Sequence, residues 1–160
     1  MHNEAFAFVK QFATDLPVTV IEIGSRDING SVRSLFPNAQ WTGIDLYAGP
    51  AVDIVGSALD YTPPDTVDMV ICCEVFEHAA EWRELIQWSA AWLKQGGMML
   101  ITCAGEGRLP HSHHDGCQLR DGEYYENISP EEIRDSMESA GIHVLIATTL
   151  GNDTQAMGIN

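Results

Sequence analysis

The sequence predicts an α/β fold with a doubly wound, mostly parallel sheet and an antiparallel last strand. Segments rich in β-branched residues alternate with segments of helical periodicity, which is typical of a parallel sheet covered by helices on both faces. The last two strand-like segments are joined too tightly for a parallel crossover, so they should pair antiparallel. The 160 residues fit a single domain, residues 1–160, and 45% hydrophobic residues are enough for one packed core.

The first part of the chain alternates between helical and strand-like patterns. Apolar residues recur at helical spacing over residues 2–14, which predicts an amphipathic helix. Residues 18–24, "VTVIEIG", are rich in β-branched residues and predict a buried strand. A short helix should follow and end at Pro37, because proline cannot continue a helix. Three more strands are expected, the last two separated only by a loop, at residues 41–46, 51–56 and 67–73.

A longer helix is expected next. Its apolar stripe begins at Trp82 and reaches Leu93, and a Gly-Gly pair should stop it. A fifth strand is then expected at residues 98–105. The polar, glycine-rich segment 105–128 is too long for a plain connector, so it is a candidate for contact with substrate.

The last part of the chain carries a helix start and a strand pair. Ser129 precedes Pro130, and Glu132 follows three residues after the serine, which predicts a capping box at the start of a helix. Two final strands are expected on either side of the polar sequence "LGNDTQ", at residues 142–148 and 156–160.

The charge balance argues against nucleic acid as a partner. The chain has 8 basic and 23 acidic residues, a formal net charge of −15, and such a field repels phosphate backbones. No apolar run approaches the ~18 residues that a membrane span needs, and the start, "MHNEAFAFVK", lacks the pattern of a signal peptide. The cysteine spacing fits no zinc site. We interpret these residues as reduced thiols of a cytoplasmic protein: Cys72, Cys73, Cys103 and Cys117.

The stretch "VIEIGSRDING", Val20–Gly30, predicts a ligand site. Gly24 ends the first strand, and ligands of open parallel sheets lie beyond the carboxyl ends of the strands. A glycine there lets the backbone approach a ligand closely, and the helix N-terminus that follows attracts negative charge. Asp45 lies 21 residues after Gly24, at the end of the second strand. A carboxylate at that place can accept both hydroxyl protons of a ribose.

The glycine spacing distinguishes between nucleotides. Dinucleotide-binding turns read G-x-G-x-x-G, whereas this turn reads G-S-R-D-I-N-G, with glycines only at its two ends. Ser25 and Arg26 should prevent the close backbone approach that a pyrophosphate needs, which disfavours NAD. The Gly-Lys-Ser/Thr sequence of a phosphate-binding Walker loop is absent. A nucleoside without phosphates is the remaining common choice.

Taken together, these segments resemble the class I S-adenosylmethionine-dependent methyltransferases. The resemblance rests on "VIEIGSRDING", on Asp45, on "VDMVICCEVFEH" at the fourth strand and on "WLKQGGMMLIT" leading into the fifth. The segment "ISPEEIRDSMESAGI" is similar to the late helix of the family, so the resemblance covers nearly the whole chain. The chain departs from the family in its widely set first glycines and in Ser57, where an acidic residue is frequent.

The resemblance implies S-adenosylmethionine as the cofactor and assigns residues to its parts. Gly24 and Gly30 would let the loop pass the methionyl part, and Glu22 would interact with the amino group, often through water. Asp45 would hold the ribose, and Leu46 would pack on the adenine. The other implied contacts are Ser25, Arg26 and Asn29 in the first loop, Ser57 and Ala58 after the third strand, and Cys73 and Glu74 at the end of the fourth.

Several of these residues have a structural alternative. Glu22 could instead pair with a neighbouring chain. Arg26 could bind the carboxylate of the cofactor, because a guanidinium makes charge-assisted contacts, or it could face solvent. Cys73 could be core filler. The pair Glu77-His78 is frequent in this family and is more often structural than catalytic.

The sequence "HSHHDGC", residues 111–117, concentrates imidazole groups. His111, His113, His114 and Asp115 could supply metal ligands or a general base with a pKa near neutrality. The third interpretation is a solvated loop that does neither. The candidate catalytic residues are His113 and His114, and no metal is assigned.

The predicted function is transfer of a methyl group from S-adenosylmethionine to a small-molecule acceptor, with protein side chains as a further possibility. The Asn/Asp-Pro-Pro-Tyr/Phe motif of amino-methylating nucleic-acid enzymes is missing, because the fourth strand leads into "CCEVF". Two alternatives stay open: a cofactor-binding, non-catalytic partner of another methyltransferase, and a small NAD-binding oxidoreductase. The short connections predict an open pocket, or a partner subunit that closes it.

Overall fold

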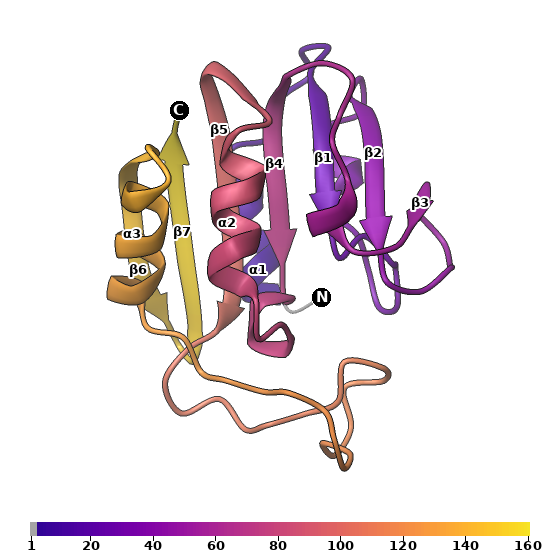
Figure 1. Cartoon of the computed structure of the whole chain (residues 1–160), viewed down its shortest axis with the longest axis vertical. Coiled ribbons are helices and arrows are strands. Elements are labelled where there is room, and N and C mark those ends of the chain that lie inside the picture. Colours follow the sequence, from indigo (N-terminus) through magenta and orange to yellow (C-terminus); the bar gives the residue numbers. More distant parts are fainter. Residues whose placement is uncertain (1–2) are drawn as a thin grey trace.

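In the computed structural model, which describes residues 3–160, seven strands form one sheet with the order β3-β2-β1-β4-β5-β7-β6 (Figure 1). The first five strands pair in parallel, and β7 pairs antiparallel with both β5 and β6. This confirms the predicted fold class. The strands are β1 (Thr19–Ile23), β2 (Gln40–Asp45), β3 (Ile54–Val55), β4 (Val67–Cys73), β5 (Leu93–Ala104), β6 (His143–Leu150) and β7 (Asp153–Ile159).

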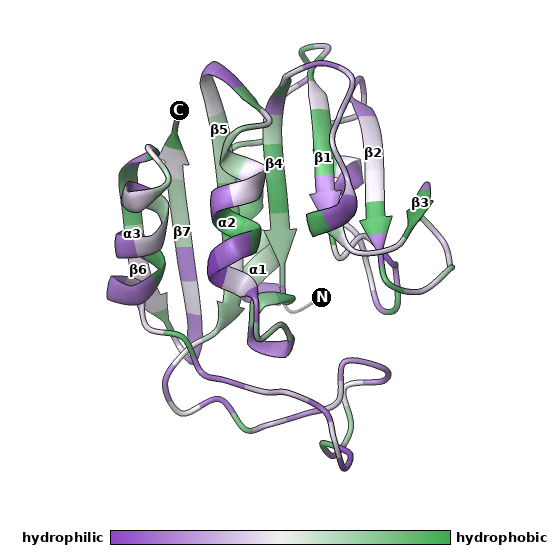
Figure 2. Cartoon of the chain, viewed as in Figure 1, coloured by the Kyte–Doolittle hydropathy of each residue, from purple (hydrophilic) through white to green (hydrophobic). Residues whose placement is uncertain are grey.

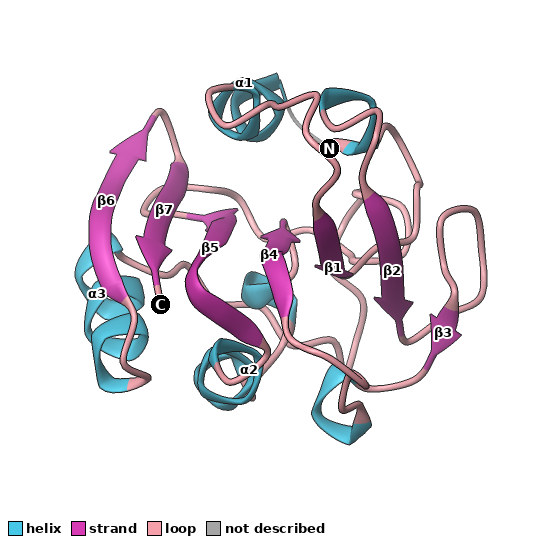
Figure 3. Ribbon diagram, turned by 90° about the horizontal axis from the view of Figure 1, so that it is seen from above, coloured by secondary structure: helices cyan, strands magenta, loops and turns pink. Residues whose placement is uncertain are grey.

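Helices lie on both faces of the sheet (Figure 3). Alternate side chains of the central strands fill the two layers, since Ile21 and Val70 pack in one apolar cluster and Val20 and Ile71 in the other. Figure 2 shows hydrophobic residues along β4, whereas the long loop below the sheet is mostly hydrophilic. One face carries α2 (Trp82–Ala90), α3 (Pro130–Ser139) and the 3₁₀ turn η2 (Ala58–Asp60), and the other carries α1 (Asn3–Lys10) and the turn η1 (Arg33–Leu35).

The connection between β1 and β2 is shorter than a usual helical crossover. The helix expected there is only the single turn η1, and Pro37 follows it closely. Val32 and Phe36, on either side of η1, are almost fully buried and cover β1 on the α1 face. Two apolar anchors therefore cover this part of the sheet in place of a long helix.

The third strand is also shorter than expected. Ala51 has φ +66°, which breaks the extended conformation before the strand begins. Asp53 then ties the segment to β2, because its N–H donates to the Gly43 carbonyl (2.9 Å) and its Oδ2 accepts from the Gly43 N–H (2.7 Å). Pairing with β2 follows over Ile54–Val55 and not over the whole of residues 51–56.

Two boundaries in the second half differ from the sequence pattern. α2 ends at Ala90, and Leu93 already pairs with Val67 as the first residue of β5. Leu93 is buried in this strand, so its apolar character fits either assignment. In the last hairpin the turn between β6 and β7 is only Gly151 and Asn152. The three polar residues that follow are therefore buried strand residues and not turn residues.

Of the two predicted helix starts, that of α3 is confirmed, whereas that of α1 lies partly outside the described residues. α1 begins at Asn3 and ends at Lys10, and His2, part of the helix expected over residues 2–14, lies outside the described residues. The capping box of α3 is confirmed, since Ser129 Oγ accepts from the Glu132 N–H (3.2 Å) and Glu132 accepts from the Ser129 N–H (3.0 Å). None of the helices within residues 3–160 combines the length and apolar character needed to cross a bilayer.

Asp68, the second residue of β4, should give the fold a measurable acid dependence. Its Oδ2 accepts from the N–H (2.8 Å) and the hydroxyl (2.7 Å) of Thr19, and its Oδ1 accepts from Lys94 Nζ (2.8 Å). Burial alone would raise the pKa of Asp68, but the hydrogen bonds outweigh it and lower this pKa to about 2. The carboxylate therefore stabilises the fold above its ordinary pKa of about 4, and this contribution is lost as the pH falls towards 2.

We expect Asp68→Asn to lower the free energy of unfolding by about 1 kcal/mol at neutral pH, since the Asp68 side chain is one-third exposed and solvent weakens the pair. The deficit should shrink as the pH is lowered to about 3, because the wild-type carboxylate then begins to lose its charge. Urea unfolding of the wild type and the variant at neutral pH and at about pH 3 measures this deficit. An equal deficit at both values would contradict this account.

Candidate functional site

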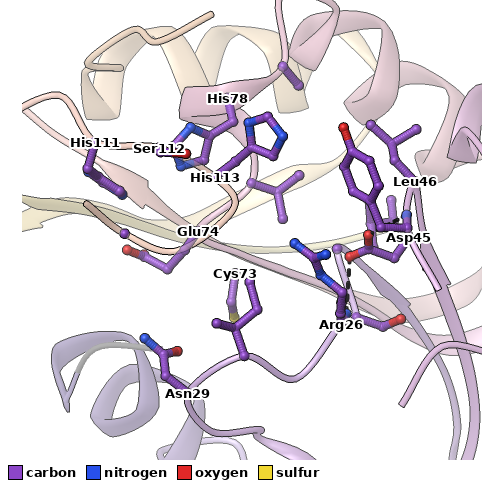
Figure 4. Close-up of a pocket in the computed structure, with 18 of the residues that line it drawn as sticks. Arg26, Asn29, Asp45, Leu46, Cys73, Glu74, His78, His111, Ser112 and His113 are labelled. Carbon is purple, nitrogen blue, oxygen red and sulfur yellow. Dashed lines mark hydrogen bonds between the residues drawn. The ribbon is translucent and has the colours of Figure 1, made fainter. Parts of the chain in front are cut away.

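A cavity of about 1150 Å³ lies between the carboxyl ends of β1, β2 and β4 and the loop that follows β5 (Figure 4). Its volume is slightly above the usual range for small-molecule sites, about 300–1,000 Å³. Every residue predicted to contact a cofactor lines it, as does His113, whereas His114 does not. The fold thus brings together Glu22, Gly24, Ser25, Arg26, Asn29, Gly30, Asp45, Leu46, Ser57, Ala58, Cys73 and Glu74.

The turn after β1 requires glycine at its first position. Gly24 has φ +73°, and a Cβ atom placed there would lie 2.0 Å from Cγ2 of Val75. The N–H groups of Gly24 and Ser25 both donate to the carbonyl of Ile44 (2.8 and 3.1 Å), which holds the turn against β2. The Ser25 hydroxyl is buried at the cavity without a hydrogen-bond partner. At the far end of the turn, the Gly30 N–H donates to Asp27 Oδ1 (2.7 Å).

Asp45 ends β2 with its carboxylate held by two backbone groups. Its Oδ2 accepts from the Arg26 N–H (3.1 Å), drawn as a dashed line in Figure 4, and its Oδ1 accepts from the Tyr47 N–H (2.9 Å). Each carboxylate oxygen has about two acceptor positions. One position on each oxygen thus stays available to the two hydroxyl groups of a diol.

Arg26 projects into the cavity between Asp45 and Cys73 (Figure 4). Its guanidinium carbon lies 5.0 Å from the centre of the Tyr47 ring, a cation–π contact, and its Nε is buried without a hydrogen-bond partner. Tyr47 also lines the cavity and was not singled out from the sequence. Its position immediately after Asp45 and Leu46 could have suggested it.

Glu22 has a partner within its own chain. Arg33 Nε donates to Glu22 Oε2 (2.9 Å), and Arg33 also donates to the Ala51 carbonyl (2.7 Å). Burial raises the pKa of Glu22, and the contact with Arg33 opposes that rise. The Glu22 carboxylate at the cavity wall is therefore held in place by the Arg33 guanidinium.

The site continues along η2 and the end of β4. Ser57 caps η2 by accepting from the Leu59 N–H (3.2 Å), which leaves its hydroxyl proton for another acceptor, and Ala58 beside it is buried. Burial raises the pKa of the Cys73 thiol to about 12, so it stays protonated at neutral pH. Glu74 has φ +58°, unusual for a residue other than glycine, and backbone strain of this kind tends to occur at functional sites.

A cluster of polar groups begins with Glu74 and Arg108 at the cavity wall and continues into the buried residues Asp153 and Glu77. Glu74 accepts from Thr102 Oγ1 (3.0 Å) and from Arg108 (3.2 Å), and Arg108 also pairs with Asp153. Burial and the nearby Glu74 carboxylate raise the pKa of Asp153 to about 6. Glu77 is fully buried, and the backbone N–H groups of Glu77 and Ala104 that face its carboxylate make no well-formed hydrogen bond with it. Burial, with Glu74 nearby, raises the pKa of Glu77 well above its ordinary value.

His78 lies next to this cluster and lines the cavity. Burial and the neighbouring rings of His111 and His113 lower the pKa of His78 to about 4, so its imidazole is neutral at physiological pH. Its ring centre lies 5.0 Å from that of His111, 5.9 Å from that of His113 and 5.4 Å from that of Tyr125. His78, His111 and His113 therefore lie near one another, on the side of the cavity opposite Leu46 (Figure 4).

The remaining loop residues make other contacts. His113 and His114 lie 3.3 and 3.7 Å from Glu123 Oε1, and the His113 ring stacks on Tyr47. Asp115 does not join the histidines through its carboxylate, which pairs with Arg120 (2.5 Å).

The two ends of the loop over residues 105–128 meet. The Ile128 N–H donates to the Ala104 carbonyl (2.8 Å), and Thr154 Oγ1 donates to the Ile128 carbonyl (2.6 Å). The loop thus leaves β5 and returns to the sheet at almost the same place.

Comparisons with known proteins agree on one fold. Residues 29–101 match the family model described as "Methyltransferase domain". No curated protein sequence matches the chain. Among solved structures, it is similar to the Burkholderia thailandensis 1,6-didemethyltoxoflavin-N1-methyltransferase with bound S-adenosylhomocysteine, at 15% identity and TM-score 0.70, covering 99% of this chain and 77% of that one.

Two further structures give similar values. One is the DhpI complex with S-adenosylhomocysteine, at 17% identity and TM-score 0.70, covering 97% of this chain and 83% of that one. The other is a methyltransferase in complex with the Haloferax volcanii activator Trm112, at 18% identity and TM-score 0.68, covering 97% of this chain and 88% of that one. At these identities the likeness shows the fold alone, which is Rossmann-like.

Proposed function

We propose that this chain, which carries a methyltransferase domain and has the fold of the class I S-adenosylmethionine-dependent methyltransferases, transfers a methyl group from S-adenosylmethionine to a small-molecule acceptor. The observation that supports the cofactor best is Asp45. Its carboxylate ends β2 at the cavity and is oriented by two N–H groups, with acceptor positions left for a ribose diol.

The other cavity residues fit the same cofactor. At Gly24 the backbone passes where no side chain has room, and the buried Ser25 hydroxyl lacks a partner that a ligand could provide. The Arg26 guanidinium can donate to a carboxylate, and Glu22, held by Arg33, can accept from an amino group. Leu46 offers an apolar side chain to a flat ring, and it is 64% exposed within the cavity mouth.

When bound, S-adenosylmethionine supplies a methyl group that its sulfonium already makes electrophilic. The task of the protein is to exclude water and to hold the acceptor in line, and alignment of this kind can lower a barrier by roughly 7–11 kcal/mol. The protonated Cys73 thiol at the cavity wall does not compete as a nucleophile. His113 lines the cavity and stays the candidate base, whereas His114 lies outside the lining.

The acceptor is proposed to be small for two reasons. The cavity is covered by the loop over residues 105–128, which suits a ligand enclosed by side chains rather than a long polymer. The net charge of −15 disfavours nucleic acid. All four cysteines are free thiols, and we propose a reducing compartment such as the cytoplasm.

The cofactor is tested by calorimetry with S-adenosylhomocysteine and with NAD⁺ under the same conditions. We expect saturable binding of S-adenosylhomocysteine and no heat from NAD⁺, because the turn at Ser25 and Arg26 leaves no room for the close approach of a pyrophosphate. Binding of NAD⁺ alone would overturn the proposal.

The acceptor class is tested with methyl-labelled S-adenosylmethionine and a cell extract separated into small molecules, proteins and nucleic acids. We expect label in the small-molecule fraction. Label that enters only the protein or nucleic-acid fraction would show that the proposed acceptor class is wrong, while leaving methyl transfer itself established.

A further inference from the structure

We propose that Glu77, His78 and His111 form a binding site for one divalent transition-metal ion at the acceptor end of the cavity. Each of the three residues offers a ligand atom, and these atoms all lie within 4.8 Å of one another. A tetrahedral ion bound at ~2.1 Å places its ligands ~3.4 Å apart, so modest side-chain rotations complete the site. Two imidazoles and a carboxylate suit a first-row transition metal such as Zn²⁺ better than Mg²⁺.

The strongest sign of a missing ligand is Glu77. Its side chain is 0% exposed, and the backbone N–H groups of Glu77 and Ala104 that face the carboxylate make no well-formed hydrogen bond with it. Nδ1 of His78 is likewise buried without a partner. Buried polar atoms without partners are rare in native proteins and often mark an absent ion or water. Glu77 and His78 are consecutive residues, and each has buried polar atoms that lack a well-formed hydrogen bond.

The local charges also call for a cation. Beside Glu77 lie the carboxylate of Glu74 and the guanidinium of Arg108, which already pairs with both Glu74 and Asp153. The one guanidinium near Glu77 is therefore shared by two other carboxylates. A divalent cation would give the buried Glu77 carboxylate a partner of opposite charge of its own.

The site faces the ligand cavity from behind. His78 and His111 line the cavity and Glu77 does not, so an ion between them would have its protein carboxylate on the buried side and open positions on the cavity side. Figure 4 shows His78 and His111 on the same side of the cavity, with Glu74 below them. If the proposed methyl transfer holds, such an ion would bind an acceptor through an oxygen atom. Metal binding itself does not depend on that function.

A second histidine group supplies a matched control. His113, His114 and Glu123 also offer ligand atoms within 4.8 Å. However, Glu123 already accepts from the Ser112 hydroxyl (2.7 Å) and from the Arg120 N–H (2.8 Å), and the rings of His113 and His114 pack against each other with centres 3.9 Å apart. This group is therefore satisfied without a metal, which is why we assign the ion to the first one.

The test is calorimetric titration of the full chain, freed of metal by a chelator, with Zn²⁺ and in parallel with Co²⁺, whose visible spectrum reports coordination. We expect one ion per chain, and no competition from millimolar Mg²⁺. His111→Ala should weaken the affinity by about 100-fold or more, because loss of groups that merely support a ligand already costs 10–100-fold. The double variant His113→Ala/His114→Ala should bind as the wild type does.

Glu77→Gln keeps the size of the buried side chain and should weaken binding as His111→Ala does. If Glu77→Gln does not fold, His111→Ala alone decides, since His111 lies in a loop. Absence of saturable binding by the wild type would overturn the proposal, as would loss of binding in the double variant but not in His111→Ala. Calorimetry with S-adenosylhomocysteine on the same samples separates this outcome from failure of the proposed function.

Discussion

Asp45→Ala should remove most of the thermal stabilisation that S-adenosylhomocysteine gives to this protein. The wild-type carboxylate has an acceptor position left on each oxygen for the two ribose hydroxyls. Hydrogen bonds to a charged group contribute about 1.5–3 kcal/mol each, so loss of both should weaken binding at least ~100-fold. Thermal unfolding with and without the ligand measures the effect.

The matched control is Asp135→Ala, which removes the same charge from an exposed position of α3 that does not line the cavity. It should keep the full ligand-induced shift. Asp45→Asn should give an intermediate shift, because the amide oxygen still accepts one hydrogen bond. If Asp45→Ala shows the wild-type shift, Asp45 does not hold the ligand, and the proposed orientation of the cofactor is wrong.

Gly24→Ala should destabilise the fold by about 3 kcal/mol. A left-handed conformation costs an alanine about 1–2 kcal/mol, and the added Cβ would lie 2.0 Å from Cγ2 of Val75, a clash that adds a similar amount. Urea unfolding of the variant and the wild type gives the difference. The same substitution should also disturb the Ser25 and Arg26 side of the cavity, because they follow directly in the turn.

Gly96→Ala separates the two causes. Gly96 has φ +77°, close to that of Gly24, but no atom lies within 4 Å of a Cβ placed there. It should therefore cost only the conformational part, about 1 kcal/mol. Adding Val75→Ala to Gly24→Ala should recover part of the loss by removing the clashing methyl group. Equal costs for the two glycine variants would show that the clash with Val75 does not form.

The sequence predicted the sheet well where pattern and burial coincide. Residues 67–73 have the bounds of β4, because a continuous apolar run buried on both faces has few other solutions. The end of α2 was wrong because Leu93 fits a helical stripe and is equally apolar as the first residue of β5. The antiparallel pairing of the last two strands was predicted, but the start of β7 was placed three residues too late. Asp153 and its two polar neighbours look like turn residues, whereas their partners lie far away in the chain.

The candidate site divides in the same way. Residues such as Gly24 and Asp45 were found because their places at strand ends follow from the strand pattern alone. The grouping of Glu77 and His78 with His111 was not found, since 32 residues separate the two parts and no metal-binding spacing joins them. Only the path of the loop over residues 105–128 brings His111 back over the end of β4.

The closed base of that loop has a consequence for how this protein could diversify. Because the Ala104 carbonyl and the Ile128 N–H are hydrogen-bonded, the whole segment between them begins and ends at one point of the scaffold. A grafted segment of different length would meet the same two anchor points and leave the strand order undisturbed. On the proposed function, in which this loop covers the acceptor, acceptor preference should thus be exchangeable as a cassette between such proteins without changing the residues proposed to bind the adenosyl group.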